Sequence, residues 1–250
     1  MRVRLLVLAA VSAVTVPAAG QAPSTQPPPW KGKNLQFFPA DISRDALIQR
    51  MREFSFALSV RCQYCHAGGD GISFDGVDFS SDDKPAKLKA RAMLKMVDAI
   101  NKTMLPQVPS RAEPRVDVDC VTCHHGLALP KSLQTTLFEI VAKDGTDAAV
   151  ARYRELRNDD TLSGRYNFGE WEINELARRL VESGNVTAAI AILDMNGEYY
   201  PKSSAIDTQL GRLFETTGDK VKALQRYHQA IEKDPDNQLA KSRIAALEKR

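Results

Sequence analysis

The sequence has little of several residue types, and each shortage narrows the range of functions. Its 250 residues include only four His, four Cys and two Trp, and 34 Lys and Arg stand against 31 Asp and Glu. A dedicated nucleic-acid binder needs a strong basic excess, so that class is excluded. The sequence also offers no phosphate-binding loop, paired carboxylates or activated nucleophile, and therefore no catalytic residue.

The N-terminus has the pattern of a secretory signal peptide. Two arginines near the start precede an apolar run that ends at Val16, and small residues follow. This order predicts a signal peptide at 1–22, cleaved after Gly20 or Ala22, and export to the periplasm; an uncleaved anchor is the alternative. The run is too short to cross a bilayer. The Pro-rich stretch 23–34 cannot form a core and is expected to be a linker.

The four cysteines form two copies of one pattern, each followed directly by histidine: Cys62-Gln63-Tyr64-Cys65-His66 and Cys120-Val121-Thr122-Cys123-His124. Two thiols three positions apart lie on one helical turn, where each can form a thioether with a haem vinyl group. The next residue then projects its imidazole towards the iron. The motifs predict two covalently bound haem c groups, with His66 and His124 as proximal iron ligands.

Three other uses of paired cysteines remain open. A Cys₄ zinc site, two disulfides in an oxidising compartment and redox-active dithiols all use such pairs. None of them requires a histidine after both pairs. Haem is attached outside the cytoplasm in bacteria, in agreement with export, so the haem interpretation is favoured.

Methionines are the expected second axial ligands. Besides the proximal pair, the chain has only His125, which adjoins a proximal ligand and points elsewhere, and His228, which lies far downstream. Four methionines on apolar helical patterns precede a haem motif: Met51, Met93, Met96 and Met104. A methionine in such a pattern usually fills a core. Here two irons each need a donor, which favours the ligand role.

Two helices are expected to carry these methionines. Residues 41–60 have apolar residues at helical spacing, with Asp41 or Ser43 as the N-cap. A second helix is expected to follow the capping residues 80–83, with Pro85 in its first turn. Basic residues recur along it at Lys84, Lys87, Lys89, Arg91 and Lys95. They are expected to line a solvated face, or a docking patch for an acidic redox partner.

The order of these elements along the chain resembles that in a known protein family. Met51, the two CxxCH motifs, residues 79–85 and the run 91–101 together resemble the cytochrome subunit of photosynthetic reaction centres. The resemblance covers roughly residues 34–127. It implies that each haem has its proximal histidine in CxxCH and its distal methionine on the preceding helix.

The resemblance also assigns the ligands. It pairs His66 with Met51 and His124 with Met93, and Met96 is the second choice. This chain departs from the family, which carries four haems, because it has only two motifs. Gln107 stands where an additional histidine ligand is expected, and the lipid-anchoring cysteine is missing. A dihaem electron-transfer unit is therefore implied, without donation to a photosynthetic pigment.

The C-terminal part, residues 136–250, has an internal period of 34 residues. The period relates Gly184 to Gly218, Ala189 to Ala223 and Pro201 to Pro235. It is the period of tetratricopeptide repeats, whose helix pairs stack into a concave surface that takes a peptide or partner protein. The alternative is a stack that only stabilises the haem unit.

The expected architecture is all-α, with a compact dihaem c-type cytochrome domain at 35–130 and a tetratricopeptide-like domain at 136–250. The expected function is periplasmic electron transfer between redox partners, one of them a periplasmic or membrane-associated redox protein, with the repeat groove for docking. No nucleic acid and no membrane span after signal cleavage are expected. Electron transfer is favoured over catalysis. The alternatives are a dihaem peroxidase-like enzyme with one open iron and a zinc-stapled repeat adaptor.

Overall fold

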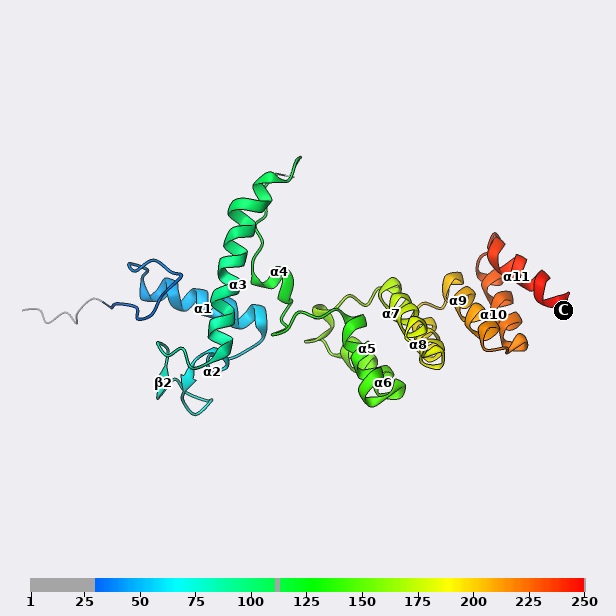
Figure 1. Ribbon diagram of the computed structural model, residues 1–250, viewed down its shortest axis with the longest axis horizontal. Coiled ribbons are helices and arrows are strands. Elements are labelled where there is room, and N and C mark those ends of the chain that lie inside the picture. The colour runs from blue at the N-terminus through cyan, green and yellow to red at the C-terminus, as the bar shows by residue number, and fades with distance from the viewer. Residues whose placement is uncertain (1–29, 111–112, 250) are drawn as a thin grey trace, which may run out of the picture.

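The protein is an elongated, all-α molecule, which confirms the predicted fold class. A computed structural model describes residues 30–110 and 113–249. The predicted signal peptide, and the predicted linker up to residue 29, lie outside these residues. Figure 1 shows a first group of helices, within residues 44–124, followed by a row of helices within residues 133–248. None of the helices in the described ranges is long and apolar enough to cross a membrane.

The chain enters the first motif through helix α1 (Arg44–Leu58). Of the two candidate caps, Ser43 is used, and its hydroxyl accepts a hydrogen bond from the Ala46 amide at 3.2 Å. Satisfying a free N–H in this way stabilises the start of a helix. Ser59 ends α1 in the left-handed conformation, with φ of 50°. The short helix α2 (Cys62–Cys65) follows.

A hairpin separates α2 from the next helix. Strands β1 (Ala67–Gly68) and β2 (Val77–Asp78) pair antiparallel. The N-cap of the next helix is Lys84, which makes no side-chain capping bond. The expectation that residues 80–83 cap this helix is wrong, because their side chains bind elsewhere: the Asp82 carboxylate, for example, pairs with basic side chains of the helix itself.

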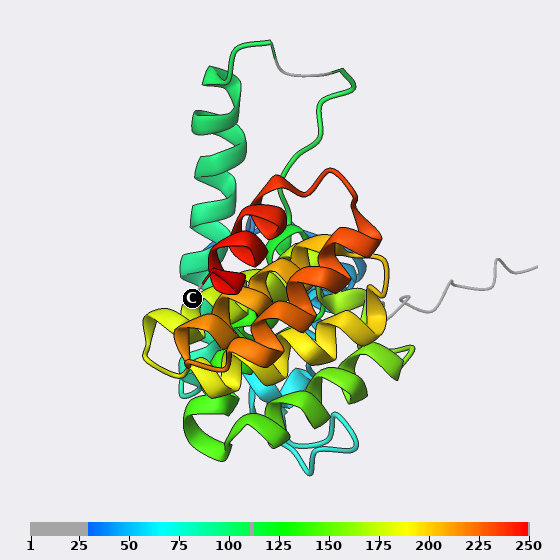
Figure 2. The same cartoon turned by 90° about the vertical axis from the view of Figure 1, so that its right-hand side faces the viewer.

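Helix α3 (Pro85–Ala99) runs on without a break into a π-helical turn, η1 (Ile100–Met104), and a 3-10 turn, η2 (Leu105–Gln107). It projects beyond the neighbouring helices in both views (Figures 1 and 2). The chain then returns towards the body of the molecule and forms α4 (Cys120–His124), the second motif.

The remaining helices pack mainly against their neighbours in the chain. They are α5 (Leu133–Asp144), α6 (Thr146–Asn158), the 3-10 turn η3 (Ser163–Arg165), α7 (Glu170–Glu182), α8 (Val186–Tyr199), α9 (Ser204–Thr216), α10 (Lys220–Lys233) and α11 (Gln238–Glu248). Figure 2 shows them stacked one behind another. A helical repeat arrangement of this kind buries apolar faces within each helix pair and against the neighbouring pair.

The 34-residue period has a structural counterpart. Gly184 and Gly218 both have positive φ, of 82° and 81°. Each is followed by a residue whose side chain caps the next helix, Asn185 for α8 and Asp219 for α10. Ala189 and Ala223, which the period also relates, are both fully buried. Equivalent positions thus have equivalent conformations.

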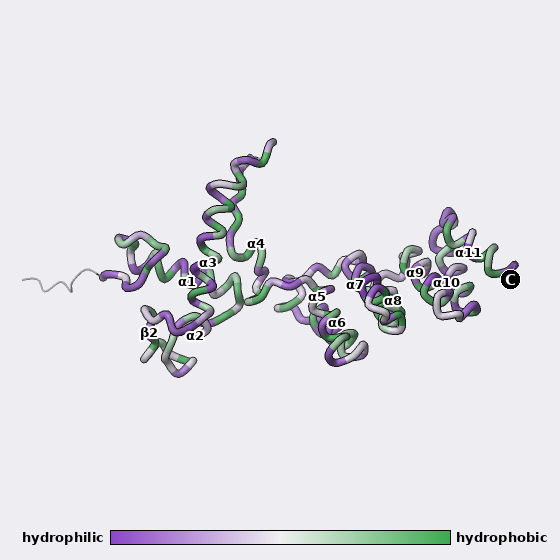
Figure 3. Tube along the Cα trace, viewed as in Figure 1, coloured by the Kyte–Doolittle hydropathy of each residue, from purple (hydrophilic) through white to green (hydrophobic). Residues whose placement is uncertain are grey.

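The apolar core lies almost entirely in the row of repeat helices. Buried hydrophobic residues run from Leu133 to Leu247, whereas Ala57 is the only one in the described part of residues 30–130. Several large apolar side chains of that first half are exposed, among them Phe56, Phe74 and Met104. Hydrophobic positions also recur along the projecting helix α3 (Figure 3). The first half therefore does not bury a core from protein atoms alone.

Candidate haem-binding sites

The first motif occupies a single turn. Cys62 and Cys65 begin and end α2, and the His66 amide donates to the Cys62 carbonyl at 3.0 Å. The Nδ1 atom of His66 is buried. Because Nδ1 is covered by protein, Nε2 is the nitrogen available to an iron atom. This matches the way a proximal histidine binds haem iron.

The residues after β2 form the wall beside this histidine. The Phe79 ring meets the His66 imidazole edge-on, with ring centroids 5.0 Å apart. Within the hairpin, the Gln63 amide donates to the Ser73 carbonyl at 2.9 Å and ties the loop to the motif. The hairpin therefore fixes the proximal side of the first site. Phe79 was not predicted as a site residue, because nothing in its local sequence pattern indicates a contact with His66.

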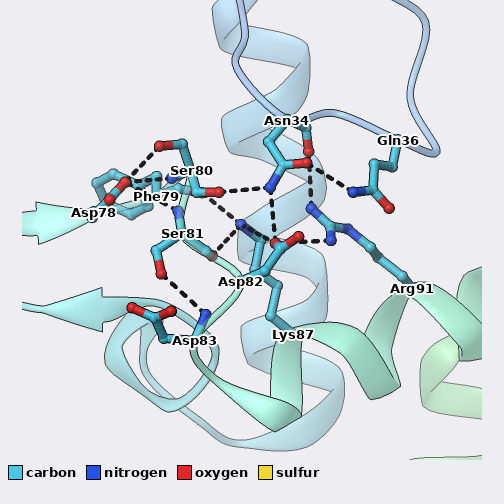
Figure 4. Close-up of polar contacts among 10 residues, drawn as sticks. All are labelled: Asn34, Gln36, Asp78, Phe79, Ser80, Ser81, Asp82, Asp83, Lys87 and Arg91. Carbon is cyan, nitrogen blue, oxygen red and sulfur yellow. Dashed lines mark hydrogen bonds and ion pairs between the residues drawn. The ribbon is translucent and has the colours of Figure 1, made fainter.

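A buried lysine holds the same wall in place (Figure 4). Lys87 is only 9% exposed, and its Nζ donates to the Phe79 carbonyl at 3.0 Å and the Ser81 carbonyl at 2.6 Å. It also lies 3.2 Å from the Asp82 carboxylate. The expectation that the basic residues of α3 all line a solvated face is therefore wrong for Lys87. A buried ammonium group is tolerated here because carbonyl and carboxylate oxygens surround it.

Arg91 completes this cluster one turn later. Its guanidinium pairs with Asp82 at 2.8 Å and donates to the Asn34 carbonyl at 2.9 Å. The Asn34 side chain in turn donates to Asp82 at 2.8 Å. Hydrogen bonds from Arg91 and Asn34 hold the pKa of Asp82 well below its usual range. The cluster thus fastens the last residue of the predicted linker to α3.

The cluster also affects the first histidine. Burial lowers the pKa of His66, and the positive charges of Lys87 and Arg91 lower it further. A hydrogen bond to the Phe79 backbone and the negative charge of Asp78 raise the pKa, but by less than burial and the two positive charges lower it. A neutral imidazole is the form that binds iron. The surroundings of His66 therefore favour the ligating form.

The second motif is capped at its start and closed by a hydrogen bond at its end. Asp119 accepts from the Thr122 amide at 3.0 Å, and the Asp119 amide donates to the Thr122 hydroxyl at 3.1 Å, which makes a capping box. His124 Nδ1 lies 2.7 Å from the Leu127 carbonyl. Because a carbonyl only accepts, Nδ1 carries the proton and Nε2 keeps its lone pair for iron. His125, at the left-handed C-cap, is exposed.

The electrostatics of the second motif differ from those of the first. Burial raises the pKa of the Cys120 thiol, and the negative charges of Asp119 and Glu53 contribute in the same direction. Glu53 belongs to α1, which packs against α4. Burial, with a smaller contribution from Cys62, raises the pKa of Cys65 at the first motif.

Each motif packs against the long helix that precedes the other motif: α1 precedes α2, and α3 precedes α4. α1 contacts α4, and the Gly126 amide after α4 donates to the Ala57 carbonyl at 2.9 Å. α2 contacts α3 in the same way. By contrast, no comparably extensive contact joins α1 to α2 or α3 to α4 within the described residues. Each methionine helix thus packs less extensively against the motif that follows it than against the other motif, as expected if a planar group lies between them.

The candidate methionines differ little in exposure. Met51 is half-buried on α1, whereas Met93 and Met96 are each 47% exposed on α3. Met104 lies in the π-helical turn and is 59% exposed. Exposure alone therefore does not distinguish Met93 from Met96, and the orientation of α3 has to be considered instead.

Asn101 connects α3 to the chain that enters the second motif. Its Nδ2 donates to the Val118 carbonyl at 2.7 Å, and its Oδ1 accepts from the Val118 amide at 2.8 Å. Met93, Val97 and Asn101 are spaced four residues apart and so follow one face of the helix. Met96 follows Met93 by three residues and lies about 60° round the helix from it, on the side away from Asn101. Of the two methionines, Met93 is therefore the nearer to the side of α3 that carries Asn101.

Replacing Asn101 tests this connection. In the haem-loaded protein we expect Asn101→Ala to lower the free energy of unfolding by about 1–3 kcal/mol, because two hydrogen bonds are lost and the partly buried groups of Val118 are left without these partners. Denaturant unfolding followed by the haem absorbance measures the change. Asn101→Asp keeps only the acceptor, so its free energy of unfolding should lie between those of the wild type and Asn101→Ala. Equal stability of all three proteins would contradict the role assigned to Asn101.

The four cysteines do not form a common metal site. In the part of the chain that the structure describes, no group of three or more Cys, His, Asp or Glu side chains is placed to hold a metal ion. A structural zinc needs four ligands gathered at tetrahedral geometry. The zinc alternative is therefore disfavoured, and the residues fit two separate CxxCH sites.

Paired cysteines on a helical turn, each pair followed by a histidine with a covered Nδ1, define a c-type cytochrome: an electron-transfer protein with covalently bound haem c. The model of the family "Photosynthetic reaction centre cytochrome C subunit" matches residues 33–167, which is more than half of the chain. The protein therefore belongs to the photosynthetic reaction centre cytochrome C subunit family. The matched region begins where the resemblance begins and continues through α5 and α6.

A curated relative agrees with this family. Cytochrome c-554 of Chloroflexus aurantiacus is 34% identical over 107 residues, which make up 43% of this chain and 23% of the relative. The chain thus spans less than a quarter of the length of that relative.

Proposed function

We propose that the protein is a periplasmic electron carrier with two haems, one on each CxxCH motif. The observation that carries this proposal is the construction of the two motifs. In each, the cysteines lie on one turn and the Nδ1 of the histidine is covered or hydrogen-bonded by protein, at His66 and at His124. The near absence of an apolar core in the described part of residues 30–130 supports the proposal, because two large apolar cofactors would supply the missing contacts.

At each site the cysteines attach the haem and the histidine ligates its iron. A bound haem supplies a one-electron couple at its iron. Cys62 and Cys65 hold the first group by thioethers and His66 ligates it, while Cys120, Cys123 and His124 do the same for the second. We assign Met51 and Met93 as the distal ligands. Methionine ligation raises the reduction potential relative to a second histidine, which suits a carrier at the high-potential end of a chain.

The repeat helices are assigned a docking role. We propose that residues 136–250 form a tetratricopeptide-like domain that places the cytochrome domain next to a periplasmic or membrane-associated redox protein. The 34-residue period in the glycines and helix caps supports this assignment. η3 is tied to the cytochrome half by Arg165, which donates to the Gly126 carbonyl at 2.9 Å. A signal peptide at 1–22 would deliver the protein to the same compartment.

The intact mass of the denatured protein tests the haem count. After co-expression with a c-type haem maturation system, we expect the chain shortened at Gly20 or Ala22 plus two covalently retained haems. One haem would reject the dihaem assignment, and none would reject haem attachment. Ferric spectra complete the test: two low-spin haems support the carrier, whereas one high-spin haem that turns over peroxide would favour a peroxidase-like enzyme.

A further inference from the structure

The proximal histidine of the second motif depends on the short loop that follows it. His124 Nδ1 donates to the Leu127 carbonyl at 2.7 Å, and the Leu127 amide donates back to the His124 carbonyl at 2.7 Å. A hydrogen bond at Nδ1 fixes the ring orientation of a metal-binding histidine and makes its other nitrogen a stronger donor to the metal. The position of the Leu127 carbonyl therefore sets both the orientation and the donor strength of His124.

Gly126 is the point at which this loop is held. It has a positive φ of 79°, and a Cβ atom there would lie 3.2 Å from Ser59 Oγ and 3.3 Å from Arg165 Nε. The Gly126 amide donates to the Ala57 carbonyl of α1 at 2.9 Å. The Gly126 carbonyl accepts from the Arg165 guanidinium at 2.9 Å. Both backbone groups of Gly126 are thus bound, each by a different segment that is distant in the chain.

Arg165 is itself fixed in place, so it can support the loop. Its Nε donates to the Thr161 carbonyl at 3.1 Å, while its terminal nitrogen bonds the Gly126 carbonyl. A pocket open to solvent lies beside the same loop, and Leu127 and Arg165 both line it. The loop is therefore not buried on this side, and the hydrogen bond from Arg165 restrains it there.

We infer that Arg165 is a positioning residue for the second haem. By holding the Gly126 carbonyl, it fixes the next carbonyl, that of Leu127, to which the proximal histidine donates. Arg165 belongs to η3 and lies 39 positions beyond Gly126, and the family model matches the chain as far as residue 167, just past η3. The second site thus extends beyond residue 130, into the segment that leads to the repeat helices. This inference rests on the proposed dihaem function and adds to it a residue from outside both motifs.

Resonance Raman spectra of the full-length, haem-loaded protein test the inference, because the stretching frequency of the iron–histidine bond follows the donor strength of the imidazole. Met93→Ala and Met51→Ala are the two parent proteins, and in each one haem should be five-coordinate when reduced. If Met96 proves to be the distal ligand, Met96→Ala replaces Met93→Ala. In the parent with the second haem open, Arg165→Met should shift the iron–histidine frequency to a lower value. In the Met51→Ala parent, the same change should leave the frequency of the first haem unchanged.

Two further variants separate the hydrogen bond from general effects of substitution. Arg154→Met is the matched control, because Arg154 is another arginine of the C-terminal half and joins α6 to α8 through an ion pair with Glu198 at 2.8 Å. It should leave the iron–histidine frequencies of both parents unchanged. Arg165→Lys keeps a donor for the Gly126 carbonyl but loses the Nε bond to Thr161, and it should give a smaller shift in the same direction. It also serves as the test if Arg165→Met does not fold.

The outcomes separate this inference from the proposed function. A protein with two haems in which neither Arg165 variant shifts the frequency of the second haem would overturn the inference and leave the dihaem carrier intact. Equal shifts at both haems, or an equal shift in Arg154→Met, would also overturn it, because the effect would then not pass through the loop at Gly126. An intact mass with fewer than two haems would instead reject the proposed function before any spectrum is recorded.

Discussion

Protein produced without haem attachment is expected to lose the structure of residues 30–130 and to keep that of the repeat helices. Fixing the backbone of a residue costs about 1–2 kcal/mol, and burial of apolar surface offsets this cost at roughly 25 cal/mol per Å². In the described part of the first half, Ala57 is the only buried hydrophobic residue. From Leu133 onwards, the helices bury apolar side chains against one another.

Hydrogen exchange measured by mass spectrometry is the appropriate experiment. In a chain with all four cysteines replaced by serine, amides of α1 and α3 should exchange within seconds, whereas those of α7 to α10 should stay protected. The haem-loaded wild type is the control and should protect both halves. Slow exchange of α1 and α3 in the haem-free chain would show that the first half folds without its cofactors. That result would remove a main support for the proposed sites.

Replacing Met93 with alanine is expected to convert one of the two haems from low-spin to high-spin, while replacing Met96 leaves both low-spin. The reason is the position of each residue on α3. Met93 is spaced four and eight residues from Val97 and Asn101. The Asn101 side chain bonds both the amide and the carbonyl of Val118, which lies two residues before α4. Met96 lies about 60° round the helix from Met93, further from the side of Asn101. Loss of the true ligand opens the iron to solvent.

Ferric absorption and electron paramagnetic resonance spectra measure this change, and binding of carbon monoxide to the reduced protein gives an independent count of open irons. Met51→Ala is the companion variant and should open the other haem. A high-spin signal in Met96→Ala but not in Met93→Ala would assign the ligand to Met96. It would also show that the Asn101 connection does not set the orientation of the ligand.

The two sites illustrate how far local pattern determines function. The spacing of each CxxCH motif predicts a site because its cysteines and histidine lie within one helical turn, and each motif does form such a turn. The helix capped by Ser43 and the 34-residue period follow from local preferences in the same way. These features depend on interactions between residues only a few positions apart, so the sequence reveals them directly.

The surroundings of the sites depend on distant contacts and could not be predicted. Lys87 belongs to a basic run that suggests a solvated face, yet it is buried because the loop before α3 folds back over it. Arg91 meets Asn34, which is 57 positions away in the chain. Asn101 reaches Val118 across 17 positions. No local pattern indicates such contacts, because each exists only when both segments are already in place.

The sequence by itself therefore determined the class of cofactor, the candidate attachment residues and the helical character of both halves. The tertiary structure decided which helix each motif packs against, which backbone carbonyl accepts the hydrogen bond from His124 and which charges lie beside each site. The physical reason is a difference in range. Covalent attachment and helix formation act within a turn, whereas burial, electrostatics and hydrogen bonding between segments depend on how the whole chain is arranged.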